Sequence, residues 1–273
     1  MLALSGCGKS EGATKNEETI ESVTEATTET ITEAITETTT ETTTEASNQA
    51  TTEAYSSDSG DDAHVIKLEL METDNPYISE LMNESGIYID SLGNEAQYHY
   101  QIPQFNANFE SAMSLNKRIT DDLYNIIAME YEAMNKGTSL LNFNITYDVV
   151  EYDKIVAIIA TVPYPGDTKL YFAYTYDFEN NKEITNAELL AMNNMSEQEF
   201  VERACKMGEK YFMDQASIMG ITDEEELNRY MESAKEKTTI NLPMYYDENK
   251  VLNVYVPFPS AAGASYYYHL CRF

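Results

Sequence analysis

A glutamate at every fourth position rules out a packed fold for the first part of the chain. Within residues 8–62, which are rich in Thr, Glu and Ala, this series begins at Glu17 and continues to Glu45. In a helix the spacing would place like charges at i and i+4, which is destabilising, and Thr is a poor helix former. We therefore expect a disordered linker that spans about 40 Å as a flexible coil. A Thr-rich O-glycosylated stalk is the alternative interpretation.

The charge of the chain excludes one class of partner. Its 273 residues include 47 Asp and Glu against 17 Lys and Arg, which gives a formal net charge of −30. Residues 64–273 hold 33 of these acidic and 15 of these basic residues, so this part alone has a net charge of −18. Such a chain repels phosphate backbones, and nucleic acid is therefore not an expected partner.

The first ten residues contain a motif that indicates how the chain is held in a cell. Leu4-Ser5-Gly6-Cys7 resembles a bacterial lipobox, in which the peptide is cut before the cysteine and the thiol receives a lipid. We interpret residues 1–7 as a truncated lipoprotein signal peptide with Met1 inside the true apolar region, and Cys7 as the lipidation site. This predicts a lipid-anchored, extracellular location on the outer face of the bacterial cytoplasmic membrane.

The sequence argues against a nucleotide-binding loop and against a transmembrane helix. Residues 3–10 fit a loose nucleotide-binding loop, but no strand precedes the loop and an acidic run follows it. No stretch approaches 18 consecutive apolar residues, so the sequence predicts no transmembrane helix.

Residues 63–273 are long enough for one hydrophobic core, and we interpret them as a single extracytoplasmic domain. Apolar residues at helical spacing predict a helix from about residue 108 to 136, and Gly137 is expected to end it. Three strands in a meander follow, of which 154–162 is almost wholly apolar and so is expected to be central. The predicted strands are 64–71, 86–92, 95–102, 141–149, 154–162, 168–178, 239–246, 251–258 and 265–273.

Two capping motifs mark the starts of two further helices. Ser196-Glu-Gln-Glu199 and Thr222-Asp-Glu-Glu225 have the capping-box pattern, and apolar residues at helical spacing follow each of them. Helices and hairpins come in blocks and do not alternate along the chain. We therefore expect an α+β fold in which an antiparallel sheet, a three-strand meander plus a C-terminal hairpin, packs with two or three helices.

The sequence predicts no catalytic or metal site. Cys205 and Cys271 could pair outside the cell or remain buried thiols, and neither has an identifiable partner base. His64, His99 and His269 lack the spacing of metal ligands. Carboxylates are plentiful, but no pair stands out as a glycosidase would require. We therefore expect no catalytic residues, no metal and no cofactor.

Tyrosine provides the most distinctive feature of the predicted domain. The chain has 21 Tyr, 9 Phe and no Trp. Tyr supplies large contact area at low entropic cost and is favoured at binding surfaces, although it is also a common strand former. We expect a binding surface on the last hairpin and on the turn at residues 163–167, because loops often carry function. The predicted binding residues are Tyr266, Tyr268, Pro257, Gly263 and Gly166.

Four parts of this domain resemble a family of bacterial extracytoplasmic domains. These are the lysozyme-binding ectodomain of certain anti-sigma factors and the accessory domain that precedes some peptidoglycan deacetylase modules. The similar parts are Ile102-Pro-Gln-Phe105 with Leu115-Asn-Lys-Arg-Ile119, the meander, residues 176–184 with Ala187-Glu-Leu-Leu190, and residues 241–263. The chain departs from the family at Pro165-Gly166-Asp167, where Gly-Ala-His is common, and at Asn180-Asn181, which replaces Thr-Gly. The resemblance implies a fold and a cell-envelope setting, and it carries over no catalytic or signalling role.

Three functions compete on this basis. The preferred hypothesis is a non-catalytic, lipid-anchored surface domain that binds a cationic protein such as lysozyme, or a cell-wall glycan, because acidic charge steers cationic partners. The alternative is an envelope enzyme or accessory module that acts on peptidoglycan, which would need a cleft with perturbed carboxylates or a metal. A solute-binding lipoprotein ranks last, because the domain is small for two lobes and lacks alternating strands and helices.

Overall fold

A computed structural model describes residues 66–139, 142–164, 168–260 and 266–273, all within one compact unit. The described residues have the predicted α+β class, with strands in two sheets and helices packed on both. The predictions for residues 1–7 with the lipidation site Cys7, for the linker 8–62, and for Gly166 and Gly263 lie outside the described residues.

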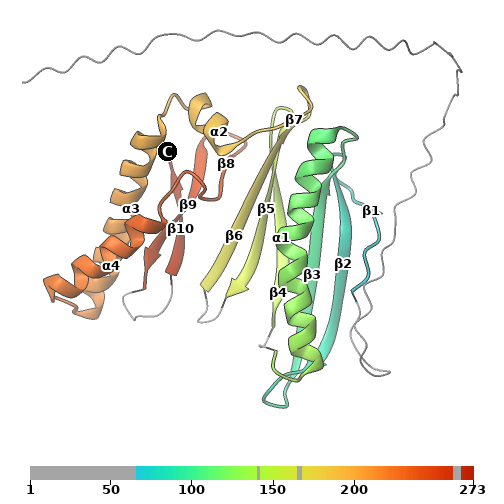
Figure 1. Cartoon of the computed structure of the whole chain (residues 1–273), viewed down its shortest axis with the longest axis horizontal. Coiled ribbons are helices and arrows are strands. Elements are labelled where there is room, and N and C mark those ends of the chain that lie inside the picture. Colours follow the sequence, from blue (N-terminus) through green and yellow to red (C-terminus); the bar gives the residue numbers. More distant parts are fainter. Residues whose placement is uncertain (1–65, 140–141, 165–167, 261–265) are drawn as a thin grey trace, which may run out of the picture. The chain divides into compact units, whose positions relative to one another are not determined.

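Seven strands form one mixed sheet, and they follow one another in chain order across it (Figure 1). Neighbours run antiparallel except for β3 and β4, which are parallel and pair His99 with Asn144 and Tyr100 with Ile145. The strands are β1 (Met71–Glu72), β2 (Ile78–Ile89), β3 (Glu95–Phe105), β4 (Asn144–Tyr152), β5 (Ile155–Tyr164), β6 (Thr168–Asp177) and β7 (Lys182–Glu183).

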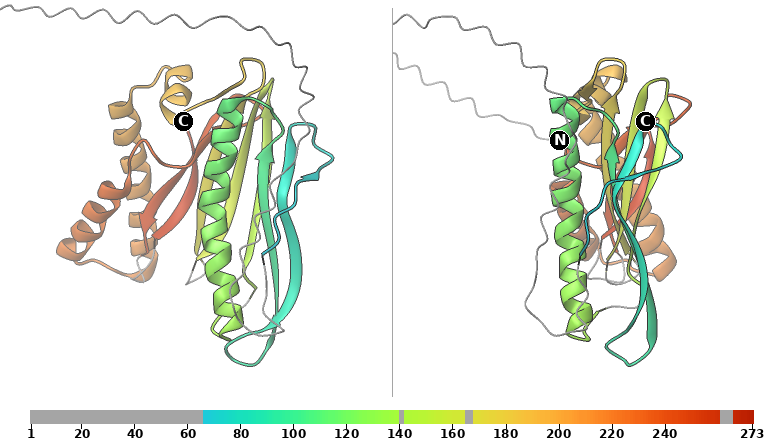
Figure 2. Two further views of the ribbon diagram at one scale, coloured as in Figure 1. Left: turned by 45° about the vertical axis from the view of Figure 1, so that its right-hand side comes forward. Right: turned by 90° about the vertical axis from the view of Figure 1, so that its right-hand side faces the viewer.

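Helix α1 (Glu110–Asn135) provides the crossover that a parallel pair of strands requires. It lies along one face of the sheet beside β3 (Figure 2). Gly137 has a φ of 64°, the left-handed conformation that ends the helix as predicted. The buried stripe of α1 consists of Ala112, Leu115, Ile119, Leu123, Ile127, Tyr131 and Met134.

The last third of the chain builds a second, antiparallel sheet and three helices. The strand order is β10–β9–β8, and α3 and α4 both pack on β9. The strands are β8 (Met244–Tyr246), β9 (Leu252–Pro259) and β10 (Tyr266–Arg272), and the helices are α2 (Asn186–Met192), α3 (Glu197–Met219) and α4 (Glu224–Lys237).

Strand β5 is covered on both faces, which confirms its predicted central position. Val156 and Ile158 belong to the core beneath α1. Ala157 and Ile159, on the opposite face, pack with Tyr245 of β8. The two sheets are therefore in contact, with β5 between α1 on one side and the second sheet on the other (Figure 2).

Two features of the architecture differ from the expectation. The large sheet is mixed and not purely antiparallel, because α1 returns the chain to run parallel to β3. The described residues form four helices where two or three were expected. The additional helix is α2, which has only seven residues, too few for a helical period to show. Its start is nevertheless marked by a complete capping box between Thr185 and Glu188.

Three predicted strands have different bounds. Residues 66–70 form no strand, and β2 begins at Ile78 instead of residue 86. A buried Glu80 and a register shift between Glu80 and Met82 hide the alternation of β2. The strand predicted for residues 239–246 is reduced to β8. The preceding carbonyls of Ile240 and Leu242 instead accept hydrogen bonds from the Asn186 amide at 2.8 and 3.0 Å.

Candidate functional site

Tyrosines from β6 and from the second sheet meet where the two sheets touch. The ring of Tyr171 on β6 stacks on Tyr255 of β9, with centroids 3.8 Å apart and 11° between the planes. Tyr171 also meets Tyr268 of β10 edge-on, with centroids 6.1 Å apart. Tyr245 of β8 lies 6.4 Å from Tyr255. We call Tyr171, Tyr245, Tyr255 and Tyr268 the tyrosine cluster; Tyr245 is buried and the other three are half-buried.

The phenols of this cluster are neutral at physiological pH. Burial raises the pKa of Tyr171 and of Tyr268, and burial together with the adjacent tyrosines and Asp148 raises the pKa of Tyr255. A neutral phenol both donates and accepts hydrogen bonds, and the face of its ring attracts cations. Asp148 is exposed on β4 and adds a negative charge near the rings. The cluster therefore has the chemistry to receive positively charged side chains.

The structure separates the two predicted tyrosines. Tyr268 belongs to the tyrosine cluster, whereas Tyr266 is engaged with α4. The hydroxyl of Tyr266 hydrogen-bonds to the hydroxyl of Ser233, and the ammonium of Lys237 lies 4.0 Å from the centre of its ring. These contacts hold the first residue of β10 against the helix. They leave Tyr268 as the one predicted tyrosine in position to join a binding surface at the cluster.

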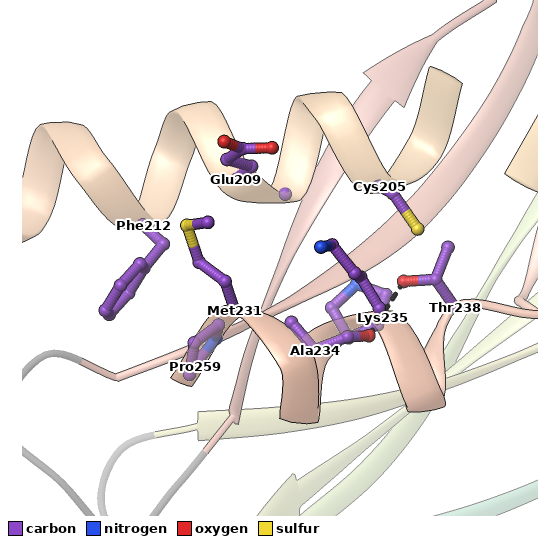
Figure 3. Close-up of a pocket in the computed structure, with 10 residues that line it drawn as sticks. Cys205, Glu209, Phe212, Met231, Ala234, Lys235, Thr238 and Pro259 are labelled. Carbon is purple, nitrogen blue, oxygen red and sulfur yellow. Dashed lines mark hydrogen bonds between the residues drawn. The ribbon is translucent and has the colours of Figure 1, made fainter. Parts of the chain in front are cut away.

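Pro257 is buried in the contact between β9 and α3. Its carbonyl oxygen lies only 3.0 Å from the place that a Cβ on Gly208 would occupy, so the helix approaches the strand closely because residue 208 has no side chain. Beside this contact, a cavity of about 10 Å³ lies between α3, α4 and β9 (Figure 3). It has room for about one water molecule, so it is a packing gap and too small for a larger ligand.

The two cysteines of the described domain are free thiols. Cys205 is half-buried and lines the small cavity (Figure 3). Cys271 is buried in β10. Burial raises the pKa of the Cys271 thiol to about 11. Since the thiolate is the reactive form, such a thiol is a poor nucleophile at neutral pH. The structure shows no disulfide between Cys205 and Cys271.

The described residues contain no group of three or more His, Cys, Asp or Glu side chains that could hold a metal ion. The Nε2 atom of His99 lies 3.0 Å from Oδ1 of Asn83, and the ring of His269 packs at 3.7 Å from that of Tyr211. His64 lies outside the described part of the chain. None of the helices that the structure describes is long and apolar enough to cross a membrane.

Most of the basic side chains are engaged with neighbours. Among the described residues, seven bases form ion pairs with Asp or Glu, and three more lie over tyrosine rings. Exposed pairs of this kind add little stability, and because each engages one acid with one base, the net acidic excess of the domain is unchanged. The paired bases are Lys117, Arg118, Lys136, Lys182, Arg203, Arg229 and Lys235, and those over rings are Lys154, Lys237 and Lys250.

Sequence reasoning missed three members of the tyrosine cluster, Tyr171, Tyr245 and Tyr255. In β6 the alternation draws attention to Leu170, Phe172 and Tyr174, which pack towards α1. Tyr171 has the opposite orientation, and Tyr255 alternates with the buried valines of β9. The sequence did contain a signal for them, namely an aromatic residue on the face of a strand that points away from the main core. Such a residue needs a second layer of structure or a ligand to cover it.

Comparisons with known proteins show only a distant structural similarity. No family model matches the chain, and no curated protein matches it. A DUF3298 family protein from Pseudomonas aeruginosa is similar with a TM-score of 0.37 and 10% identity, over 73% of this chain and 91% of that chain. A member of the DUF3298 family from Bacteroides fragilis gives a TM-score of 0.28 and 9% identity, over 70% and 89% of the two chains. Similarities this distant carry no argument about activity.

Proposed function

We propose that the domain is a non-catalytic binding module of the cell surface whose partner is a cationic protein such as a lysozyme. The observation that carries the proposal is the tyrosine cluster beside Asp148, in a domain whose basic side chains are largely engaged. Tyrosine is enriched at protein interfaces. A net charge of −18, from 33 acidic and 15 basic residues, would steer a cationic partner towards the domain.

The sequence supports the same class of partner and its setting. The four parts of the domain named in the sequence analysis resemble a family that includes lysozyme-binding ectodomains. The lipobox at Cys7 and the acidic linker 8–62 would tether the domain to the outer face of the cytoplasmic membrane. A tether of this kind would let the domain meet soluble proteins that arrive from outside the cell.

The first test is calorimetric titration of the full chain with a cationic lysozyme at low and at physiological salt. We expect affinity in the micromolar range or better that weakens with salt but persists at physiological strength. We expect Tyr268→Ala to weaken binding about tenfold, as loss of a central interface tyrosine does. Tyr124→Ala is the matched control, because it removes a half-buried tyrosine from α1, on the other face of the large sheet.

Two outcomes would overturn the proposal. One is the absence of binding at either salt concentration by a chain whose circular dichroism shows it to be folded. The other is binding that disappears at physiological salt and is equally strong in Tyr268→Ala and the unmodified chain. That second outcome would mean charge attraction without a defined surface.

A further inference from the structure

An open hollow of about 560 Å³ lies on the outer face of β2 and β3, beside the start of β4. Strand alternation turns Tyr88, Tyr98 and Tyr100 into the core beneath α1 and the intervening residues outwards. The hollow lies on different strands from the tyrosine cluster. Its volume falls within the range of small-molecule sites. The outward side chains that line it are Ser85, Ile87, Gln97, His99, Asn142 and Asn144.

Strand pairing arranges three of these side chains in one row. Ser85 pairs with His99 across β2 and β3, and His99 pairs with Asn144 across β3 and β4. Adjacent strands lie about 4.8 Å apart, so the row presents a hydroxyl, an imidazole and an amide at regular intervals. Gln97 stands beside Ile87 in the next row, and its backbone N–H donates to Oδ1 of Asn142 at 3.4 Å.

The polar groups in this hollow are available to a ligand. The side chains of Ser85, Gln97 and Asn144 form no hydrogen bond with the part of the chain that the structure describes. The Nε2 atom of His99 is engaged with Asn83 at 3.0 Å, which orients the ring and leaves Nδ1 unoccupied by that contact. Each amide and hydroxyl can both donate and accept, so the set suits a ligand rich in hydroxyl and amide groups.

Charge narrows the class of ligand further. No charged side chain lines the hollow among the described residues, although the domain as a whole is strongly acidic. An anion would meet no Lys or Arg there, and a cation would meet no carboxylate. Ile87 is 57% exposed and Ile89 is 60% exposed on the same strand, so an apolar surface borders the polar row. A neutral molecule with polar edges and a C–H face meets all of these conditions.

We propose that this hollow is a binding site for a neutral oligosaccharide that carries N-acetyl groups. The row of Ser85, His99 and Asn144 would hydrogen-bond to the hydroxyl and amide edge of the sugar, and Ile87 would contact its C–H face. This site is separate from the tyrosine cluster and independent of the proposed cationic partner. A domain with both sites could hold a glycan strand and a cationic protein at the same time.

The test is a titration of the full chain with N,N′,N″-triacetylchitotriose, followed by calorimetry and by NMR. We expect saturable binding that changes less than twofold between low and physiological salt, because the ligand has no charge. We expect Asn144→Ala and Gln97→Ala each to weaken binding at least about fivefold, as for the loss of one hydrogen bond in a small site. Asn228→Ala is the matched control, since it removes an exposed amide from α4, away from the hollow.

The outcomes separate this inference from the proposed function. Retained lysozyme binding by Asn144→Ala, together with lost sugar binding, would support two distinct sites. If the folded chain shows no saturable sugar binding, the inference is overturned, while the proposal of a cationic partner is unaffected. Equal binding of tetraglycine and the trisaccharide would also overturn it, because the hollow would then recognise amides in general.

Discussion

A single glycine in β2 explains the position of a buried tyrosine in the neighbouring strand β3. Glycine is unfavourable inside a strand, yet Gly86 lies in the middle of β2 opposite Tyr98. A Cβ on Gly86 would lie 2.6 Å from the hydroxyl of Tyr98 and 2.7 Å from two of its ring atoms. Without that Cβ, the ring lies across the strand, and its hydroxyl donates to Glu84 at 3.0 Å.

We expect Gly86→Ala to destabilise the domain by about 1–3 kcal/mol, because the added methyl group overpacks a filled core. Urea unfolding measures the loss. The penalty should shrink in a Tyr98→Leu background, where the ring no longer occupies the space. Gly93→Ala is the comparison, since nothing lies within 4 Å of its Cβ position and only its positive φ of 82° is strained. An equal Gly86→Ala penalty with and without Tyr98 would contradict this explanation.

At the scale of elements, helix α4 begins at a side-chain cap that differs from the predicted one. Ala234 is the only buried residue of α4 in the described structure. The side chain of Asp223 accepts hydrogen bonds from the backbone N–H groups of Glu225 and Glu226 at 2.9 and 3.0 Å. The sequence motif placed the cap at Thr222, one residue earlier. Adjacent Thr and Asp residues can both serve as caps, and only the backbone path decides which one does.

We expect Asp223→Ala to destabilise the domain by about 1 kcal/mol, because two backbone N–H groups lose their acceptor. Thr222→Ala should change stability by less than about 0.5 kcal/mol, as most surface substitutions do. Thermal unfolding followed by circular dichroism compares the two variants. A larger loss in Thr222→Ala than in Asp223→Ala would show that the sequence-based cap is the correct one.

Local patterns predicted the elements well and their partners poorly. In α1 the helical spacing identified Leu115, Ile119 and Leu123, all of which are fully buried. Phe109 has the same helical spacing, but it lies at the N-cap position and is 49% exposed. The parallel pairing of β3 with β4 was missed, because it joins segments that are separated by the whole of α1.

In the candidate site, too, local features could be predicted from the sequence and contacts between distant segments could not. Tyr268 and the hairpins that carry the cluster could be predicted, because turn residues and alternation are local signals. Tyr171 and Tyr255 could not, since alternation shows which residues share a face and does not show which sheet will cover that face. The row of Ser85, His99 and Asn144 depends on the β3–β4 pairing and was missed for that reason.

For the whole molecule, Glu130 makes stability depend on pH. Burial raises the pKa of this α1 carboxyl, and a hydrogen bond from Ser139 at 3.1 Å opposes the shift only in part. The folded state therefore binds a proton more tightly than the unfolded state, in which the pKa of this carboxyl is about 4.3. This contribution is fully present below about pH 4.3. It is lost as pH rises through the raised pKa.

We expect Glu130→Gln to be more stable than the unmodified chain at pH 7 by up to about 1 kcal/mol, because the charge is removed while an acceptor for Ser139 remains. The difference should vanish towards pH 4, and urea unfolding over this range measures it. Glu132→Gln is the control of opposite sign. The ion pair with Lys136 lowers the pKa of Glu132, so its loss should destabilise the domain at pH 7. A pH-independent difference for Glu130→Gln would contradict the assignment.

Strand β5 also determines how the domain comes apart. It pairs with β4 along one edge and β6 along the other, while α1 and the second sheet cover its two faces. A strand enclosed on four sides cannot open before the layers around it separate. Its amide protons therefore exchange with solvent only through global unfolding. A partner that binds the tyrosine cluster on one side of β5 would thus slow amide exchange in the core on the other side, without touching it.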